Sequence, residues 1–124
     1  MIVVDTSALV DSLAGTRRSA SRLRGFIEQG ERLVLPSLVL YEWLRGPRRP
    51  AEVEAQEALL PSAAAVPFDA TVAEIAARLY RGLTRARGRE LDLAIAAHAL
   101  ALEAALWTLN RADFSDLPGL SLAP

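Results

Sequence analysis

The first ten residues constrain the fold of this chain more than any other stretch. Ile2-Val3-Val4 is an apolar, β-prone run, typical of a short strand buried inside a sheet. Asp5 follows directly, and Thr6-Ser7 offers helix-capping side chains before the apolar Ala8-Leu9-Val10. In an open α/β sheet, ligands bind beyond the carboxyl ends of the strands. Asp5 is therefore either a helix cap or a carboxylate aimed into a binding site, and this stretch alone leaves both open.

Strand-like and helix-like patterns alternate along the rest of the chain. We expect further strands at residues 33–35, 64–66, 105–109 and 120–122, and helices at residues 7–13, 16–29, 37–45, 51–60, 70–87 and 91–103. This alternation predicts an α/β fold of three layers, α/β/α, with helices on both faces of a mainly parallel sheet of four to five strands. The length of 124 residues fits a single domain, residues 1–124.

The composition excludes several classes of protein. The chain has no cysteine, which excludes a disulfide framework, a thiolate metal site and a cysteine nucleophile, and which suits a reducing cytoplasm. The residues before Asp5 include no basic side chain, so we expect no signal peptide. The apolar stretch 91–109 is interrupted by Asp92, His98 and Glu103, so it predicts a buried helix and a strand rather than a membrane span. We therefore expect a cytoplasmic protein with no membrane partner.

Four acidic residues stand in places where carboxylates are unusual. Asp5 ends the first predicted strand, Glu42 lies within an apolar helix, Asp92 opens the most apolar helix, and Asp113 follows the predicted strand 105–109. Carboxylates seldom occur in apolar surroundings unless they are paired or bound to a cation. Strand ends and helix starts meet at one rim of a parallel sheet, so we expect these side chains to converge.

Converging carboxylates repel one another, and a hard divalent cation relieves that repulsion. A site made only of oxygen ligands suits Mg²⁺, or Mn²⁺ as its substitute. The chemistry that such a site supports is hydrolysis of a phosphodiester, because the metal acidifies water and neutralises charge on the phosphate.

Four segments, in their order and approximate spacing, resemble the PIN-domain family, and specifically the VapC-type toxins, the ribonuclease half of a bacterial type II toxin–antitoxin pair. They are Val4-Asp5-Thr6-Ser7-Ala8-Leu9, Tyr41-Glu42, Asp92-Leu93-Ala94-Ile95-Ala96-Ala97 and Thr108-Leu109-Asn110-Arg111-Ala112-Asp113-Phe114. The resemblance covers essentially the whole chain, and the four motifs in order are far more specific than any one of them.

The resemblance implies a catalytic set and a function. Its acidic quartet is Asp5, Glu42, Asp92 and Asp113, with Asp5, Asp92 and Asp113 as metal ligands, Thr6 or Ser7 and Asn110 as supporting groups, and Glu90 and Asp116 as rival ligands. The implied protein is a Mg²⁺-dependent endoribonuclease that cleaves cellular RNA of the tRNA or rRNA class. It would form a homodimer, and a cognate VapB-like antitoxin would hold it inactive, with Leu9, Val10, Leu38 and Trp43 as possible contacts.

All basic side chains are arginines, since the chain has no lysine. Arginine binds phosphate with two parallel hydrogen bonds, so the arginines nearest the predicted rim are candidates for RNA contacts, although a solvated surface is the alternative. These candidates are Arg45, Arg48, Arg49, Arg87 and Arg89. We expect Trp43, Trp107 and Phe114 to pack in the interior rather than stack on bases. We expect His98 to be a helix residue whose ring is hydrogen-bonded or partly exposed, and the resemblance assigns it no role.

Two other functions remain open from the sequence. A phosphohydrolase of the haloacid-dehalogenase kind also begins with an aspartate after its first strand, but it needs a second acid two residues later, where this chain has Ser7. A PIN module with a degenerate site would act by binding alone. A nuclease assay with and without Mg²⁺ separates these possibilities from the ribonuclease.

Overall fold

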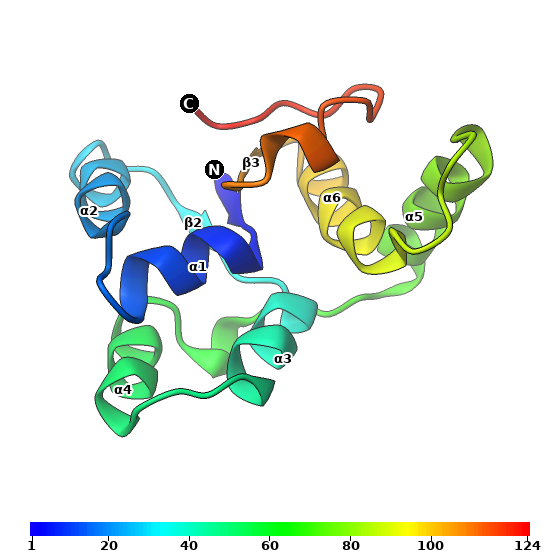
Figure 1. The fold of residues 1–124 in the computed structure, drawn as a ribbon. Helices are drawn as coiled ribbons and strands as arrows, with labels where there is room; N and C mark the ends of the chain where they lie inside the picture. Colours follow the sequence, from blue (N-terminus) through cyan, green and yellow to red (C-terminus); the bar gives the residue numbers. More distant parts are fainter.

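The computed structural model describes residues 1–124, and a small parallel sheet lies at its centre (Figure 1). Strand β1 (Ile2–Val4) pairs with β2 (Leu33–Val34) on one side and with β3 (Ala105–Trp107) on the other. The strand order is therefore β2-β1-β3. Every residue of β1 is buried, as expected for a central parallel strand that is covered on both faces.

Two further predicted strands each pair at a single residue. Val66 forms a parallel bridge with Pro36 after β2, and Leu122 forms one with Leu106 in β3. The ladder at Val66 cannot continue, because a helix begins at Ser37, directly after Pro36. The preceding residues form the 3-10 turn η1 (Ser62–Ala64) instead of strand. The regular sheet thus has three strands, and residues 66 and 122 extend its parallel order by one bridge on each edge.

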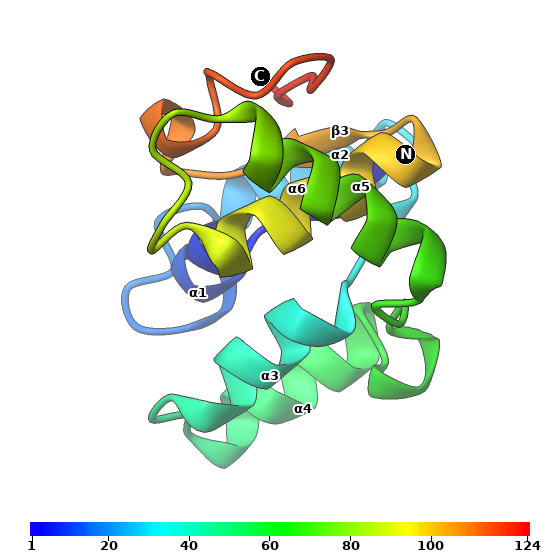
Figure 2. The same ribbon diagram turned by 90° about the vertical axis from the view of Figure 1, so that its right-hand side faces the viewer.

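Helices cover both faces of this sheet, which confirms the predicted α/β/α layers. On one face lie α1 (Thr6–Leu13) and α2 (Ala20–Glu28), where the Phe26 ring meets the Trp107 ring edge-on at 5.1 Å. On the other face lies α6 (Glu90–Leu102), with α5 (Ala70–Gly82) packed outside it (Figure 2). The helices α3 (Ser37–Arg45) and α4 (Pro50–Leu59) follow β2, and both pack against α1.

Two helices are shorter than their sequence patterns predict. The predicted helix 16–29 begins only at Ala20, because Asp11 accepts a hydrogen bond of 2.6 Å from the Ser19 hydroxyl, and Arg17 adopts a left-handed φ of 53°. The predicted helix 70–87 ends at Gly82, a poor helix former, and the chain then turns back toward α6.

The core is one cluster of 27 buried residues, to which α6 contributes Leu93, Ile95, Ala96, Ala97 and Ala99. Trp43, Trp107 and Phe114 all belong to this core, which confirms their predicted packing role. Leu9 and Trp43 have no exposed surface, so the expectation that they contact an antitoxin was wrong. The α1 and α3 faces that carry them point into the core rather than outward. No helix in the chain combines the length and the apolarity needed to cross a membrane.

His98 departs from its predicted surroundings. Its side chain is 1% exposed, and its Nε2 atom is sealed without a hydrogen-bond partner, so the expected hydrogen-bonded or partly exposed ring was wrong. The reason is that α6 lies between the sheet and α5, where the nearest aromatic neighbour is the Phe68 ring at 6.1 Å. Burial lowers the pKa of His98, and the Asp69 charge opposes this effect only partly.

A His98→Leu variant should lose less stability than the wild type on mild acidification. The unfolded chain protonates this histidine below its ordinary pKa of about 6.5, whereas the folded chain does not until the pH reaches the lowered pKa. The stabilising contribution of the neutral ring is thus complete above about pH 6.5 and falls as the pH drops, by up to about 1.4 kcal/mol per pH unit. Urea unfolding at pH 7.5 and 5.5 measures the difference. Equal losses in both proteins would contradict it.

Candidate metal centre

The predicted site residues meet at the carboxyl edge of the sheet. Asp5 follows β1 and Thr108 follows β3, and the pairing of these strands continues as the Asp5 N–H donates to the Trp107 carbonyl at 2.9 Å. The chain leaves β1 toward β2 on one side and returns to β3 on the other side. Such a reversal of strand order leaves a crevice between the outgoing connections, where open α/β sheets bind ligands.

Asp5 is buried and held by two hydroxyl groups. It is 4% exposed, and its Oδ2 atom accepts hydrogen bonds from the Thr108 hydroxyl at 2.7 Å and from the Ser7 hydroxyl at 2.9 Å. Its Oδ1 atom accepts none from the protein. One oxygen of Asp5 is therefore used to fix the carboxylate, and the other is available to a ligand. Asp5 also occupies the N-cap position of α1, without a side-chain capping bond.

The two hydroxyls are themselves oriented by the backbone after β3. The Leu109 N–H donates to Ser7 Oγ at 3.0 Å, and the Asn110 N–H donates to Thr108 Oγ1 at 3.0 Å. Each hydroxyl oxygen thus accepts a backbone proton and directs its own proton to Asp5. Sequence reasoning missed Thr108 as a site residue, although a polar residue at the end of a strand next to β1 was a usable signal.

The predicted supporting role of Asn110 is not what the structure shows. Its contribution is a backbone N–H to Thr108, and its side chain is exposed and makes no hydrogen bond. Thr6, in contrast, donates from its hydroxyl to Glu42 Oε1 at 2.6 Å. The other Glu42 oxygen lies 3.5 Å from Arg45 Nη2. Glu42 on α3 is thus tied to α1 at the edge where Asp5 ends β1.

The charges of the other three acids of the quartet all act on Asp92. Burial raises its pKa most, and the charges of Asp5, Asp113 and Glu42 raise it further, while Arg89 lowers it. These charges come from four separate elements, which are the end of β1, α3, α6 and the 3-10 turn η2 (Arg111–Asp113). The structure therefore brings together all four acids of the predicted quartet.

The two rival ligands are engaged elsewhere. Both oxygens of Asp116 accept hydrogen bonds from the Arg89 guanidinium, at 2.8 and 2.9 Å, and this pairing lowers the pKa of Asp116. Glu90 is exposed, accepts a hydrogen bond from the Gly88 N–H at 3.1 Å, and does not appear among the charges that act on Asp92.

The candidate arginines differ in whether other groups of the protein already contact their guanidinium groups. Arg89 is bound to Asp116, Arg49 pairs with Glu52 at 3.1 Å, and the Arg48 guanidinium lies 4.3 Å from the centre of the Trp43 ring. Arg45 is half-exposed beside Glu42, and Arg87 is exposed with no ion pair. Of the five, only Arg87 presents a guanidinium group that is neither in an ion pair nor over an aromatic ring, since Arg45 also lies 5.2 Å from the centre of the Tyr41 ring.

The donor set fits a divalent cation that keeps part of its water. All four groups offer carboxylate oxygens, and the raised pKa of Asp92 shows repulsion that a cation would relieve. No three of these side chains already lie close enough together to form a complete ligand set. Mg²⁺ is held in proteins by one or two carboxylates plus water, so it needs no closed cage.

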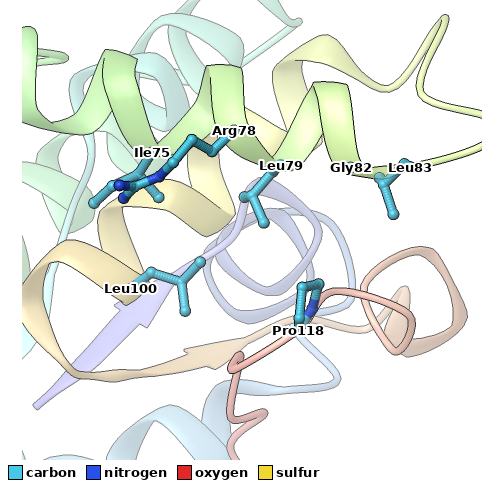
Figure 3. A pocket seen from close by; sticks show the side chains of 7 residues that line it. All are labelled: Ile75, Arg78, Leu79, Gly82, Leu83, Leu100 and Pro118. Atoms are coloured by element: carbon cyan, nitrogen blue, oxygen red, sulfur yellow. The ribbon is translucent and has the colours of Figure 1, made fainter.

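Five hollows in the surface are lined by none of these four acids. One, of about 380 Å³, lies between α5, α6 and the C-terminal segment, where Leu79, Leu100 and Pro118 line it (Figure 3). It contains no acidic side chain, so it has no part in the metal centre.

An Asp113→Asn variant should lower the pKa of Asp92, because it removes one of the charges that raise that pKa. A ¹³C NMR titration of the Asp92 carboxyl without metal measures the change. Glu90→Gln is the matched control, since Glu90 is two residues from Asp92 but is exposed, with its carboxylate hydrogen-bonded to the Gly88 N–H. If Asp113→Asn shifts Asp92 no more than Glu90→Gln does, the four acids do not converge in solution.

Comparison with known proteins agrees with this geometry. The family model for the PIN domain matches residues 2–120. The ribonuclease VapC19 of Mycobacterium tuberculosis is 34% identical over 122 residues, covering 97% of both chains. Two solved structures share the fold. DNA-bound VapBC2 from Rickettsia felis matches with a TM-score of 0.77 and 23% identity, covering 99% of this chain and 98% of that one. DNA-bound VapBC from Salmonella typhimurium matches with a TM-score of 0.77 and 21% identity, covering 98% of this chain and 96% of that one. The haloacid-dehalogenase alternative is thereby wrong, and this chain belongs to the PIN domain family.

Proposed function

We propose that this chain is a metal-dependent endoribonuclease toxin, with Mg²⁺ as its cofactor and Mn²⁺ as a substitute. The observation that carries the proposal is the raised pKa of Asp92, on which the charges of Asp5, Glu42 and Asp113 converge. A relative that is 34% identical over nearly the full length bears the name ribonuclease, which supports RNA as the substrate.

In this proposal Asp5, Asp92 and Asp113 hold the metal directly or through water, and Glu42 completes the acidic site. When bound, the metal acidifies water and neutralises charge on the scissile phosphate. Thr108 and Ser7 keep Asp5 Oδ2 engaged, which would leave Oδ1 to hold the cation. Thr6 keeps Glu42 turned toward the same edge.

The substrate in this proposal is cellular RNA of the tRNA or rRNA class, cleaved in a single-stranded segment. Loops expose unstacked bases, whereas the narrow major groove of A-form RNA hides base edges from side chains. The net charge of −1 gives no general attraction for a polyanion, so local cations must hold the flanking phosphates. Of the candidate arginines, Arg87 remains free for this role, whereas Arg45 is paired with Glu42.

We also propose a cognate antitoxin of the VapB kind as the partner. The two structural relatives named above are DNA-bound VapBC assemblies. On this chain an apolar hollow of about 270 Å³ lies between α1, α2 and α4, lined by Leu13, Leu23 and Leu59 with Arg17 and Arg24 at its rim. That combination suits an apolar helix bearing acidic residues. Homodimer formation stays a prediction.

The remaining alternative is a PIN module that binds without cleaving. The retention of all four acids, with two hydroxyls and two backbone N–H groups arranged around Asp5, favours an intact site over a degenerate one. Cleavage of RNA with Mg²⁺ and none with EDTA decides between them.

Asp5→Asn should abolish both Mn²⁺ binding and RNA cleavage while the fold persists. The amide keeps the size of the carboxylate but removes the charge that a hard cation requires. Calorimetric titration with Mn²⁺ and a cleavage assay on total RNA measure the two effects, and circular dichroism confirms the fold. Wild-type Mn²⁺ affinity in this variant would refute the proposed centre.

Thr108→Val should weaken metal affinity and cleavage by about tenfold, in the range seen when partners of metal ligands are removed. Valine has the same shape as threonine, so the loss reports only the hydroxyl that donates to Asp5. Thr84→Val, the same change at an exposed residue without a hydrogen bond, is the control. Equal activity in the two variants would show that Ser7 alone suffices to orient Asp5.

A further inference from the structure

We propose that Arg89 is a positioning residue that holds the turn bearing Asp113 against the start of α6, where Asp92 lies. The proposal rests on the metal centre proposed above and replaces the expectation that Arg89 contacts RNA. It assigns to Arg89 and Asp116 a joint role as a clamp between two ligand-bearing segments.

Three hydrogen bonds form this clamp. Arg89 Nη2 donates to the Asp113 carbonyl at 2.8 Å and to Asp116 Oδ1 at 2.8 Å, and Nη1 donates to Asp116 Oδ2 at 2.9 Å. The Arg89 side chain is only 23% exposed, although Asp116 is 51% exposed. An arginine that pairs with both oxygens of a carboxylate has a fixed geometry, unlike most surface ion pairs. Arg89 immediately precedes α6, so the clamp joins residues 113–116 to the first turn of that helix.

The turn needs such a clamp because its acid is repelled by its neighbours. Asp113 and Asp92 are carboxylates on the two segments that the clamp joins, so their like charges repel each other when no cation lies between them. The Asp113 side chain makes no hydrogen bond or ion pair of its own, and it is exposed. The backbone of η2 is a single 3-10 turn, in which the Asp113 N–H donates to the Asn110 carbonyl at 2.9 Å. Without Arg89, nothing polar holds this turn toward α6.

The buried Phe114 ring anchors the same turn from the apolar side. Phe114 fixes where the backbone enters the core, whereas Arg89 fixes the carbonyl of the ligand residue next to it. Both terminal nitrogens of the Arg89 guanidinium, Nη1 and Nη2, donate to these oxygens, so Arg89 has few donors left for a phosphate.

Metal affinity can separate the charge of Arg89 from its clamping role, because losing the charge and losing the clamp change the affinity in opposite directions. Removing a positive charge near a cation site should by itself tighten cation binding. Losing the clamp should instead weaken it, by about tenfold. We therefore expect Arg89→Met to bind Mn²⁺ about tenfold more weakly than the wild type in calorimetric titration. The matched control is Arg87→Met, which removes the same charge two residues away at an exposed side chain with no ion pair, and which should bind Mn²⁺ as tightly as the wild type or more tightly.

Backbone dynamics give a second readout that needs no metal. The ¹⁵N order parameters of Asp113 and Phe114 should fall from about 0.85, typical of a rigid backbone, to below about 0.6 in Arg89→Met, and should not change in Arg87→Met. Asp116→Asn leaves the bond to the Asp113 carbonyl and should give an intermediate value. Thermal unfolding of each variant checks that the core survives.

The outcomes separate this proposal from the proposed function. If Arg89→Met binds Mn²⁺ as tightly as Arg87→Met, or leaves the order parameters unchanged, Arg89 does not position Asp113. If Asp5→Asn binds Mn²⁺ like the wild type, the metal centre itself is wrong, and the order parameters alone decide whether the clamp exists.

Discussion

The burial of β1 is the constraint on which the rest of the structure depends. This strand is paired on both edges and covered by helices on both faces, so all three of its apolar residues are buried. A strand so enclosed cannot shift by one residue without moving its side chains to the wrong faces. Asp5 therefore has one place available to it, at the carboxyl end of the central strand.

At this end of the strand, hydrogen-bond donors stabilise the charge of one carboxylate and leave another without such donors. The hydroxyls of Ser7 and Thr108 and the backbone behind them stabilise one oxygen of Asp5. Asp92 has no comparable donors, and its pKa rises because burial and three nearby acids disfavour its charge. This repulsion destabilises the folded chain, and a bound cation would offset it. Such an imbalance is typical of sites that are built for a ligand rather than for stability.

The arginines show how a chain with a net charge of −1 distributes its cationic groups. Arg49 and Arg89 bind acids of this chain, and Arg48 lies against an aromatic ring. These contacts already occupy the guanidinium groups, so a count of arginines overstates the charge that is available to RNA. Exposed arginines without a partner, such as Arg87, are the ones that can bind phosphate at little cost to the fold.

The sequence by itself determined the alternation of strands and helices, the place of Asp5 after β1, and the segments that carry the other three acids, because these follow from local patterns of apolar and capping residues. It could not determine that Val66 and Leu122 pair at one residue only, since that depends on which backbone N–H groups face a neighbouring strand. Nor could it determine which polar residues support the acids. Thr108 contacts Asp5 across 103 residues of chain, and Arg89 contacts Asp116 across 27. Contacts between segments so far apart, like the enclosure of His98 between the sheet and α5, exist only once the layers have packed, because they depend on the distances between elements and not on the pattern within any one of them.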